Sequence, residues 1–138
     1  MRDLVNNLTV RRAISPVSVS DNTAQVSQII DKLGYGSLMF AIAIGSVADA
    51  DATFAVLVED GDQANLSDAA AVADSELYGT EALAGFQFDD DNELRKIGYV
   101  GHKRYVRLTI TPSANASAAL LSALAILGHP RTAPVVNP

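Results

Sequence analysis

Large apolar side chains alternate with small or polar ones on both sides of an acidic break in the stretch Ser37 to Asp62. They occupy every second position, first at Leu38, Phe40, Ile42 and Ile44 and then at Phe54, Val56 and Val58. A period of two residues places such side chains on one face of a β-strand. The connector contains Asp49 and Asp51, and aspartate favours turns over strand ladders. The pattern predicts two strands joined as a hairpin.

A second alternating run extends from Arg104 to Pro112. Its two faces are formed by Arg104, Val106, Leu108 and Ile110 on one side and by Tyr105, Arg107, Thr109 and Thr111 on the other. Such a division is typical of a strand with one side in the core and the other in water. Proline lacks the N–H group that a strand ladder needs, so the strand is predicted to end at Pro112.

A third pattern predicts a second hairpin. Phe86 and Phe88 alternate before the acidic tip Asp89 to Asn92, and the apolar residues of Ile97 to Val100 follow. Two short runs separated by turn-forming residues are the usual signal of this motif.

The segments around these runs define the ends and the longest loop. Residues 1–12 are predicted to form an N-terminal arm, and Ile14 to Val19 an edge strand. Asn65 to Gly79, which is rich in alanine and acidic residues, is predicted to be a long loop with at most one helical turn. Three prolines make residues 130–138 an extended tail.

Two segments are ambiguous between helix and strand. In Gln25 to Leu33, the apolar residues fall at helical spacing, but the segment is short and Gly34 follows it directly. Ala118 to Leu127 has the alanine and leucine content of a helix, yet its length also fits a buried strand. Seven or eight strands in a chain of 138 residues nevertheless predict one domain, an antiparallel β-sandwich or jelly roll.

Composition narrows the class of protein. There are no cysteines, which excludes disulfides and thiolate chemistry. Ten basic residues face 16 acidic ones, so direct binding to nucleic acid is not expected, since such binding depends on cationic contacts with phosphate. No apolar stretch is long enough to predict a spanning helix and the first residues lack signal-peptide features, so we expect no membrane partner and a product that is soluble when made.

Candidate catalytic and ligand-binding residues are few. His102 and His129 are the only imidazole bases, and neither has an activated serine nearby in the sequence. The Asp-rich turns suggest a test for calcium, although turn tips that solubilise the sheet edges explain them as well. The glycines form no phosphate-binding loop. We therefore expect no cofactor and no enzymatic activity.

Positive charge is concentrated in one part of this acidic chain, at Arg95, Lys96, Lys103, Arg104 and Arg107. Two interpretations stay open. Such residues protect sheet edges from aggregation, and they also suit contact with an acidic protein partner.

The order of several sequence blocks resembles a family of small structural proteins from tailed bacteriophages, the head decoration or capsid cement proteins. The blocks are Ile30–Asp31, Leu33 to Tyr35, Phe40 to Gly45, Ala48 to Phe54, Val56 to Gly61, Lys96 to Gly101, Arg104 to Leu108 and Leu127 to Pro130. The resemblance covers nearly the whole chain from Arg11 to Pro134. The resemblance implies a jelly-roll-like β-sandwich in which both ambiguous segments are strands. It implies no catalytic motif.

The resemblance also implies a function. The chain would be made in the host cytoplasm and would bind the outside of the capsid, where it would stabilise the shell by bridging subunits of the major capsid protein. It would also bind itself as a homo-oligomer, and three-fold oligomers suit capsid geometry. The candidate contacts to the capsid or to neighbouring subunits are Arg11, Arg12, Lys103, Arg104, Arg107 and Arg131.

Two other classes of function remain open. A head-fibre or tail-associated module would bind a host-surface glycan or protein. Glycan binding would need an exposed aromatic groove, for which Tyr35, Tyr78, Tyr99 and Tyr105 are the candidates. A hydrolase would need His102 or His129 in a cleft with an acid and a nucleophile.

Overall fold

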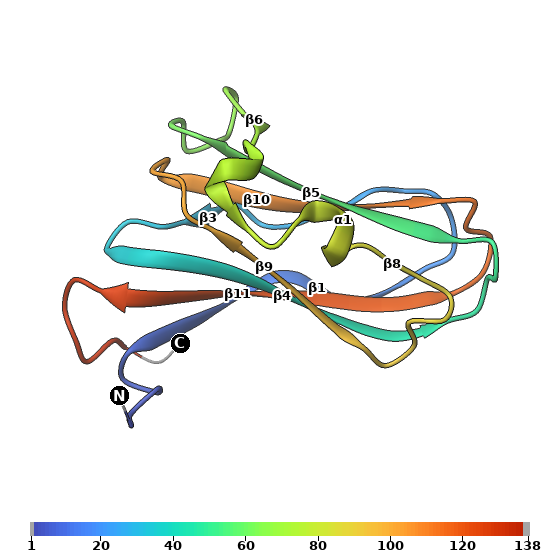
Figure 1. Ribbon diagram of the computed structural model, residues 1–138, viewed down its shortest axis with the longest axis horizontal. Helices are drawn as coiled ribbons and strands as arrows, with labels where there is room; N and C mark the ends of the chain where they lie inside the picture. Colours follow the sequence, from blue (N-terminus) through green and yellow to red (C-terminus); the bar gives the residue numbers. More distant parts are fainter. Residues whose placement is uncertain (1, 137–138) are drawn as a thin grey trace.

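Two antiparallel β-sheets packed face to face make up the protein in the computed structural model, which describes residues 2–136 (Figure 1). The five-stranded sheet has the order β1 (Leu8–Val19), β11 (Ala119–Pro130), β4 (Tyr35–Val47), β9 (Leu94–Tyr99) and β7 (Leu77–Tyr78). The six-stranded sheet contains β2 (Gln25–Val26), β10 (Tyr105–Ser113), β5 (Thr53–Gly61) and β6 (Ala70–Ala71), with β3 (Ile30–Asp31) on β10 and β8 (Phe86–Gln87) on β5. The predicted all-β antiparallel sandwich is confirmed.

The chain passes from one sheet to the other at most of its turns. β4 lies in the five-stranded sheet and β5 in the six-stranded one, while β8 pairs with β5 and β9 pairs with β4. Both predicted hairpins are therefore wrong. Alternation identifies the buried face of a strand, and a strand that faces its predecessor across the core has the same pattern as one hydrogen-bonded to it.

The core lies between the two sheets and is filled by the predicted alternating residues. Its most deeply buried members include Phe40, Ile42, Val58, Ile97, Tyr99, Val106, Leu108, Ile110 and Leu127. The rings of Phe54 and Phe86 stack with their centroids 4.6 Å apart. Pro112 is also buried and lies opposite Phe54. The next residue, Ser113, lies opposite Thr53, so β10 continues one residue beyond its predicted end.

Both ambiguous segments contain strands and no helix. β11 is bonded on both sides, so that Leu124 lies opposite Arg12 in β1 and Ala41 in β4. The ladder hydrogen bonds of a central strand outweigh the helical preference of its alanines and leucines. The segment from Gln25 to Leu33 forms only the two-residue strands β2 and β3, and both pair with β10.

The N-terminal strand is longer than predicted. β1 begins at Leu8, so residues 8–12 belong to the sheet and the predicted arm 1–12 is too long. β1 is an edge strand, as predicted for Ile14 to Val19. Its pairing with β11 is interrupted by register shifts around Ile14, and Pro16 follows, which makes this edge a poor template for another strand.

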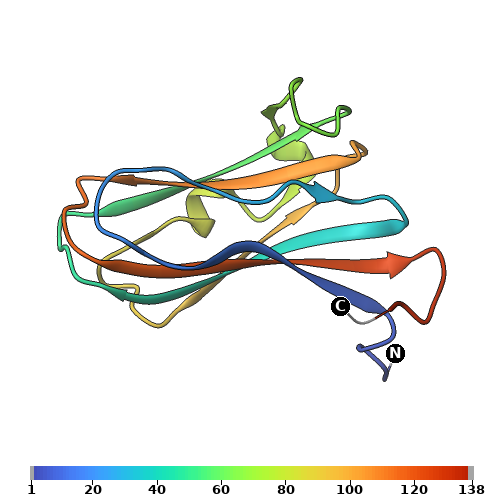
Figure 2. The ribbon, with the colours of Figure 1, turned by 180° about the vertical axis from the view of Figure 1, so that it is seen from behind.

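The first and the last described residues lie at the same end of the sandwich (Figure 2). The backbone N–H of Val135 donates to the carbonyl of Asn6 at 3.0 Å. Residues 131–136 follow β11 without regular structure, and Pro130, the first residue of the predicted tail, is the last residue of β11. Met1 of the predicted arm and residues 137–138 of the tail lie outside the described residues.

The predicted loop Asn65 to Gly79 contains more structure than expected. It includes β6, the 3-10 turn η1 (Asp74–Glu76) and β7. The short helix α1 (Glu81–Ala84) follows and was not predicted. Its N-terminus is capped by Thr80, whose Oγ1 accepts a hydrogen bond from the Leu83 N–H at 3.0 Å.

Candidate docking surfaces

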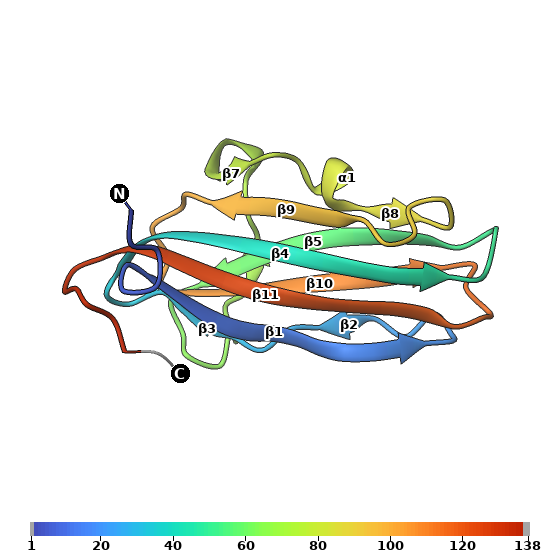
Figure 3. The same cartoon turned by 90° about the horizontal axis from the view of Figure 1, so that it is seen from below.

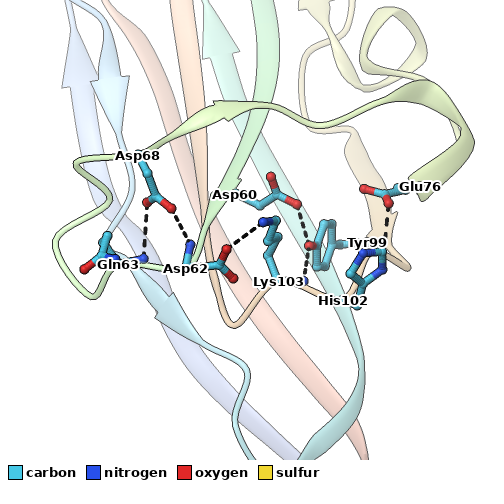
Figure 4. Close-up of polar contacts among 8 residues, drawn as sticks. All are labelled: Asp60, Asp62, Gln63, Asp68, Glu76, Tyr99, His102 and Lys103. Carbon is cyan, nitrogen blue, oxygen red and sulfur yellow. Dashed lines mark hydrogen bonds and ion pairs between the residues drawn. The ribbon is translucent and has the colours of Figure 1, made fainter.

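The two histidines have different side-chain neighbours. His102 is exposed in the loop after β9, and its Nδ1 lies 3.9 Å from Glu76 Oε1 (Figure 4). His129 lies in β11, with its Nδ1 2.9 Å from Ser37 Oγ. A serine nucleophile also needs a group that orients its base, and no carboxylate within residues 2–136 pairs with His129.

The Asp-rich turns use their carboxylates to hold backbone N–H groups. Asp49 accepts hydrogen bonds from the N–H groups of Asp51 and Ala116 at 2.9 and 2.8 Å, and these bonds lower the pKa of Asp49. Asp91 Oδ1 accepts the N–H of Val47 at 2.9 Å. No group of three or more potential metal ligands occurs in the described part of the chain. These carboxylates therefore act as turn anchors.

Most of the predicted contact cations already have partners within the chain. Arg104 makes two hydrogen bonds of 2.9 Å to the carboxylate of Asp31. This arrangement lowers the pKa of Asp31. Lys103 Nζ lies 2.6 Å from Asp62 Oδ2. These contacts connect loops at one end of the sandwich.

Three other predicted cations also have hydrogen-bond partners within the chain. Arg107 Nε donates to Glu59 Oε1 at 3.1 Å within the six-stranded sheet. Arg11 donates to the Asp31 carbonyl at 2.7 Å, and Arg12 donates to Ser15 Oγ at 3.0 Å. Arg11 and Arg104 therefore meet at Asp31, whereas Arg12 and Arg107 have separate partners.

Three of the described loops come together as a basic pocket. It has a volume of about 150 Å³, and its polar lining side chains include Lys32, His102, Lys103, Arg104 and Arg131. Of the predicted contacts it contains Lys103, Arg104 and Arg131. Lys32 was missed because it lies far from them in the sequence, and only the pairing of β3 with β10 brings it close.

A buried polar contact between the two sheets supports the basic pocket (Figure 4). Tyr99 of β9 donates its hydroxyl proton to Asp60 Oδ2 of β5 at 2.6 Å and accepts the N–H of Lys103 at 3.1 Å. Burial and the neighbouring Asp60 carboxylate raise the pKa of Tyr99. A methyl group at Gly101 would lie 2.5 Å from the Tyr99 hydroxyl, so the loop packs directly onto the ring.

The outward side of the five-stranded sheet carries large apolar side chains, and Figure 3 views the molecule from that side. We call this surface the outer apolar face; it contains Val10, Met39, Tyr78, Leu94, Leu120, Leu124 and Ile126. Tyr78 and Leu94 are 72% and 73% exposed. A few charged residues, including Arg12 and Lys96, share the face.

The outer apolar face is hollowed at two places. One hollow of about 460 Å³ lies among Met39, Tyr78, Lys96 and Ile126, and another of about 460 Å³ lies among Pro16, Gly45 and Leu120. Contiguous apolar surface of this kind marks sites of protein contact or ligand binding. The signal in the sequence was the nearly unbroken apolar run of Ala118 to Leu127, which places apolar side chains on both faces of β11.

Comparisons with known proteins identify the fold but no family. No protein-family model and no curated protein matches the chain. The structure is similar to the crystal structure of the PBSX exported protein XepA, with a TM-score of 0.54, 15% identity and 94% of this chain covered. This chain spans 40% of the XepA chain.

Two chains from phage capsids are also similar. A chain of the capsid of Ralstonia phage GP4 has a TM-score of 0.50 and 8% identity, with 96% of this chain and 90% of that one covered. A chain of the cyanophage Pam1 capsid has a TM-score of 0.47 and 12% identity, with 94% and 90% covered. At such low identity, the similarity to XepA and to the GP4 capsid chain establishes a shared fold and no more.

Among residues 2–136, no helix is long and apolar enough to cross a membrane.

Proposed function

We propose that the chain is a non-enzymatic structural protein of a bacteriophage virion, which binds the outside of the capsid and stabilises it by bridging subunits of the major capsid protein. The observation that carries the proposal is the outer apolar face. Exposed leucines, a tyrosine and a methionine on one broad sheet are typical of a surface that another protein covers.

The fold supports the same proposal. The alignment with the Ralstonia phage GP4 capsid chain covers most of both chains, so the whole sandwich corresponds to a protein found in a capsid. A capsid repeats one surface many times, so modest contacts by each copy add up to strong retention through avidity. A protein with this role needs a contact surface and no reaction centre.

The alternative, a head-fibre or tail module that binds host glycans, has weaker support. Of the four tyrosines proposed for an aromatic groove, Tyr99 is buried in the core and bonded to Asp60, and Tyr35 and Tyr105 are half-buried. Of these four, Tyr78 alone is largely exposed, and it lies beside a hollow of the outer apolar face. A single ring offers little stacking area for a sugar chain.

Replacing Leu124 with lysine is expected to weaken capsid binding about tenfold, because a charge would be buried in an apolar contact. Leu124 is 45% exposed, so the change leaves the core intact. Binding is measured by cosedimentation with purified capsids of the phage that encodes the chain. The matched control is Val26→Lys, at a residue that is 56% exposed on the other sheet. Equal binding by the two variants, or no binding by the wild type, would contradict the proposal.

A further inference from the structure

The net charge of the chain is concentrated at one end of the sandwich. We call this the acidic end; it holds the turns that follow β1, β4, β8 and β10, at the right of Figures 1 and 3. Its charged residues are Asp21, Asp49, Asp51, Asp89, Asp90, Asp91, Glu93 and Arg95. Seven acids and one base give a charge of −6, the same as the net charge of the entire chain, −6. The rest of the molecule, with nine acids and nine bases, is neutral by formal charge.

The turns of the acidic end are held in place by its own backbone contacts. Asp49 bonds to the N–H of Ala116, which ties the β4–β5 turn to the β10–β11 turn, and Asn22 Oδ1 accepts the Asn115 N–H at 2.9 Å. The exposed carboxylates of Asp51 and Asp89 take part in no such bond within the described residues, so both are available for an external contact. A charged surface that is already ordered loses little conformational entropy on binding.

The basic pocket lies at the opposite end, beside the chain termini. Lys103 and Arg104 are positioned there by Asp62 and Asp31. Lys32 and Arg131 also line the pocket, and neither forms an ion pair with a carboxylate of residues 2–136. Lys32 Nζ donates to the Gly101 carbonyl at 3.2 Å, so its charge is held at the pocket without a carboxylate of the same chain to neutralise it. The pocket volume of about 150 Å³ fits one or two acidic side chains rather than a large ligand.

From this geometry we infer that the acidic end of one copy docks onto the basic pocket of a second copy. The two surfaces are at opposite ends of one rigid sandwich, so they meet only between molecules. The resulting contact is head-to-tail, which produces a ring when the rotation between copies closes and a chain when it does not. The inference does not depend on capsid binding.

The test is a charge swap measured by analytical ultracentrifugation of the purified protein. The wild type is expected to self-associate at about 20 mM salt and to dissociate at about 300 mM, because salt screens exposed charges. The variants Lys32→Glu/Arg131→Glu and Asp51→Lys/Asp89→Lys are each expected to associate at least about tenfold more weakly alone, since attraction becomes repulsion. Mixing the two variants restores a complementary pair of surfaces, and the mixture is expected to associate again.

The matched control is Arg12→Glu/Lys96→Glu, which makes the same charge change on the outer apolar face and is expected to associate as the wild type does. Circular dichroism melts establish that each variant is folded, and Arg131→Glu alone replaces the double variant if Lys32→Glu disturbs the pocket. A wild type that stays monomeric at low salt would overturn the inference. So would variants that associate normally alone, or a mixture that fails to associate. Capsid cosedimentation is scored separately, so failure here leaves the proposed function standing.

Discussion

Replacing Phe40 with alanine is expected to lower the free energy of unfolding by about 3–5 kcal/mol. Phe40 lies in the central strand β4 and is fully buried between Ala125 of β11 and Ile97 of β9. Truncation would remove most of its apolar area from the core and leave a cavity that strands bonded on both sides cannot easily close. Urea unfolding followed by circular dichroism measures the change.

Phe88 provides the matched control, since it is also a phenylalanine but is 43% exposed. Its replacement with alanine is expected to change the free energy of unfolding by less than about 1 kcal/mol. Similar losses for the two variants would mean that Phe40 is not at the centre of the sandwich.

The second large effect is expected for Tyr99→Phe, which removes one hydroxyl group from the contact between the two sheets. The change would leave the Asp60 carboxylate, which is 8% exposed, without its donor at 2.6 Å, and the Lys103 N–H without its acceptor. A buried polar group without a partner costs about 1–3 kcal/mol, and more for a charged group. The expected loss of unfolding free energy is about 2–3 kcal/mol, measured by urea unfolding.

The same substitution at Tyr78, which is 72% exposed, is the control and is expected to have an effect within about 0.5 kcal/mol. If Tyr99→Phe were as stable as the control, the contact with Asp60 would not join the sheets in solution.

The sequence predicted which residues fill the core better than it predicted how the strands connect. Phe40, Val58 and Leu108 were placed correctly because alternation reports burial directly. Alternation carries no information on whether neighbouring strands share a sheet, so the connections β4–β5 and β8–β9 were misinterpreted as hairpins. Strands in facing sheets are not joined by backbone ladder hydrogen bonds, and this difference leaves no trace in a pattern of apolar residues.

The docking surfaces were predicted only in part. The cations Lys103 and Arg104 were recognised as a group because they are adjacent in the sequence, but their ion pairs with Asp62 and Asp31 span long distances along the chain. The acidic end could not be recognised for the same reason, since its turns come together only when the strands fold. The outer apolar face was not predicted because Ala118 to Leu127, which contains Leu124, stayed ambiguous between a helix and a buried strand.

Cryo-electron microscopy of capsids with the protein bound tests the central proposal most directly. The proposal predicts density for the two-layer sandwich on the outer surface of the capsid, across neighbouring subunits of the major capsid protein. It further predicts that the face containing Leu94 and Leu124 is turned toward the shell. Density for the protein at the tail would contradict the proposal. A contact with the shell through the six-stranded sheet, which would leave the outer apolar face in solvent, would contradict it as well.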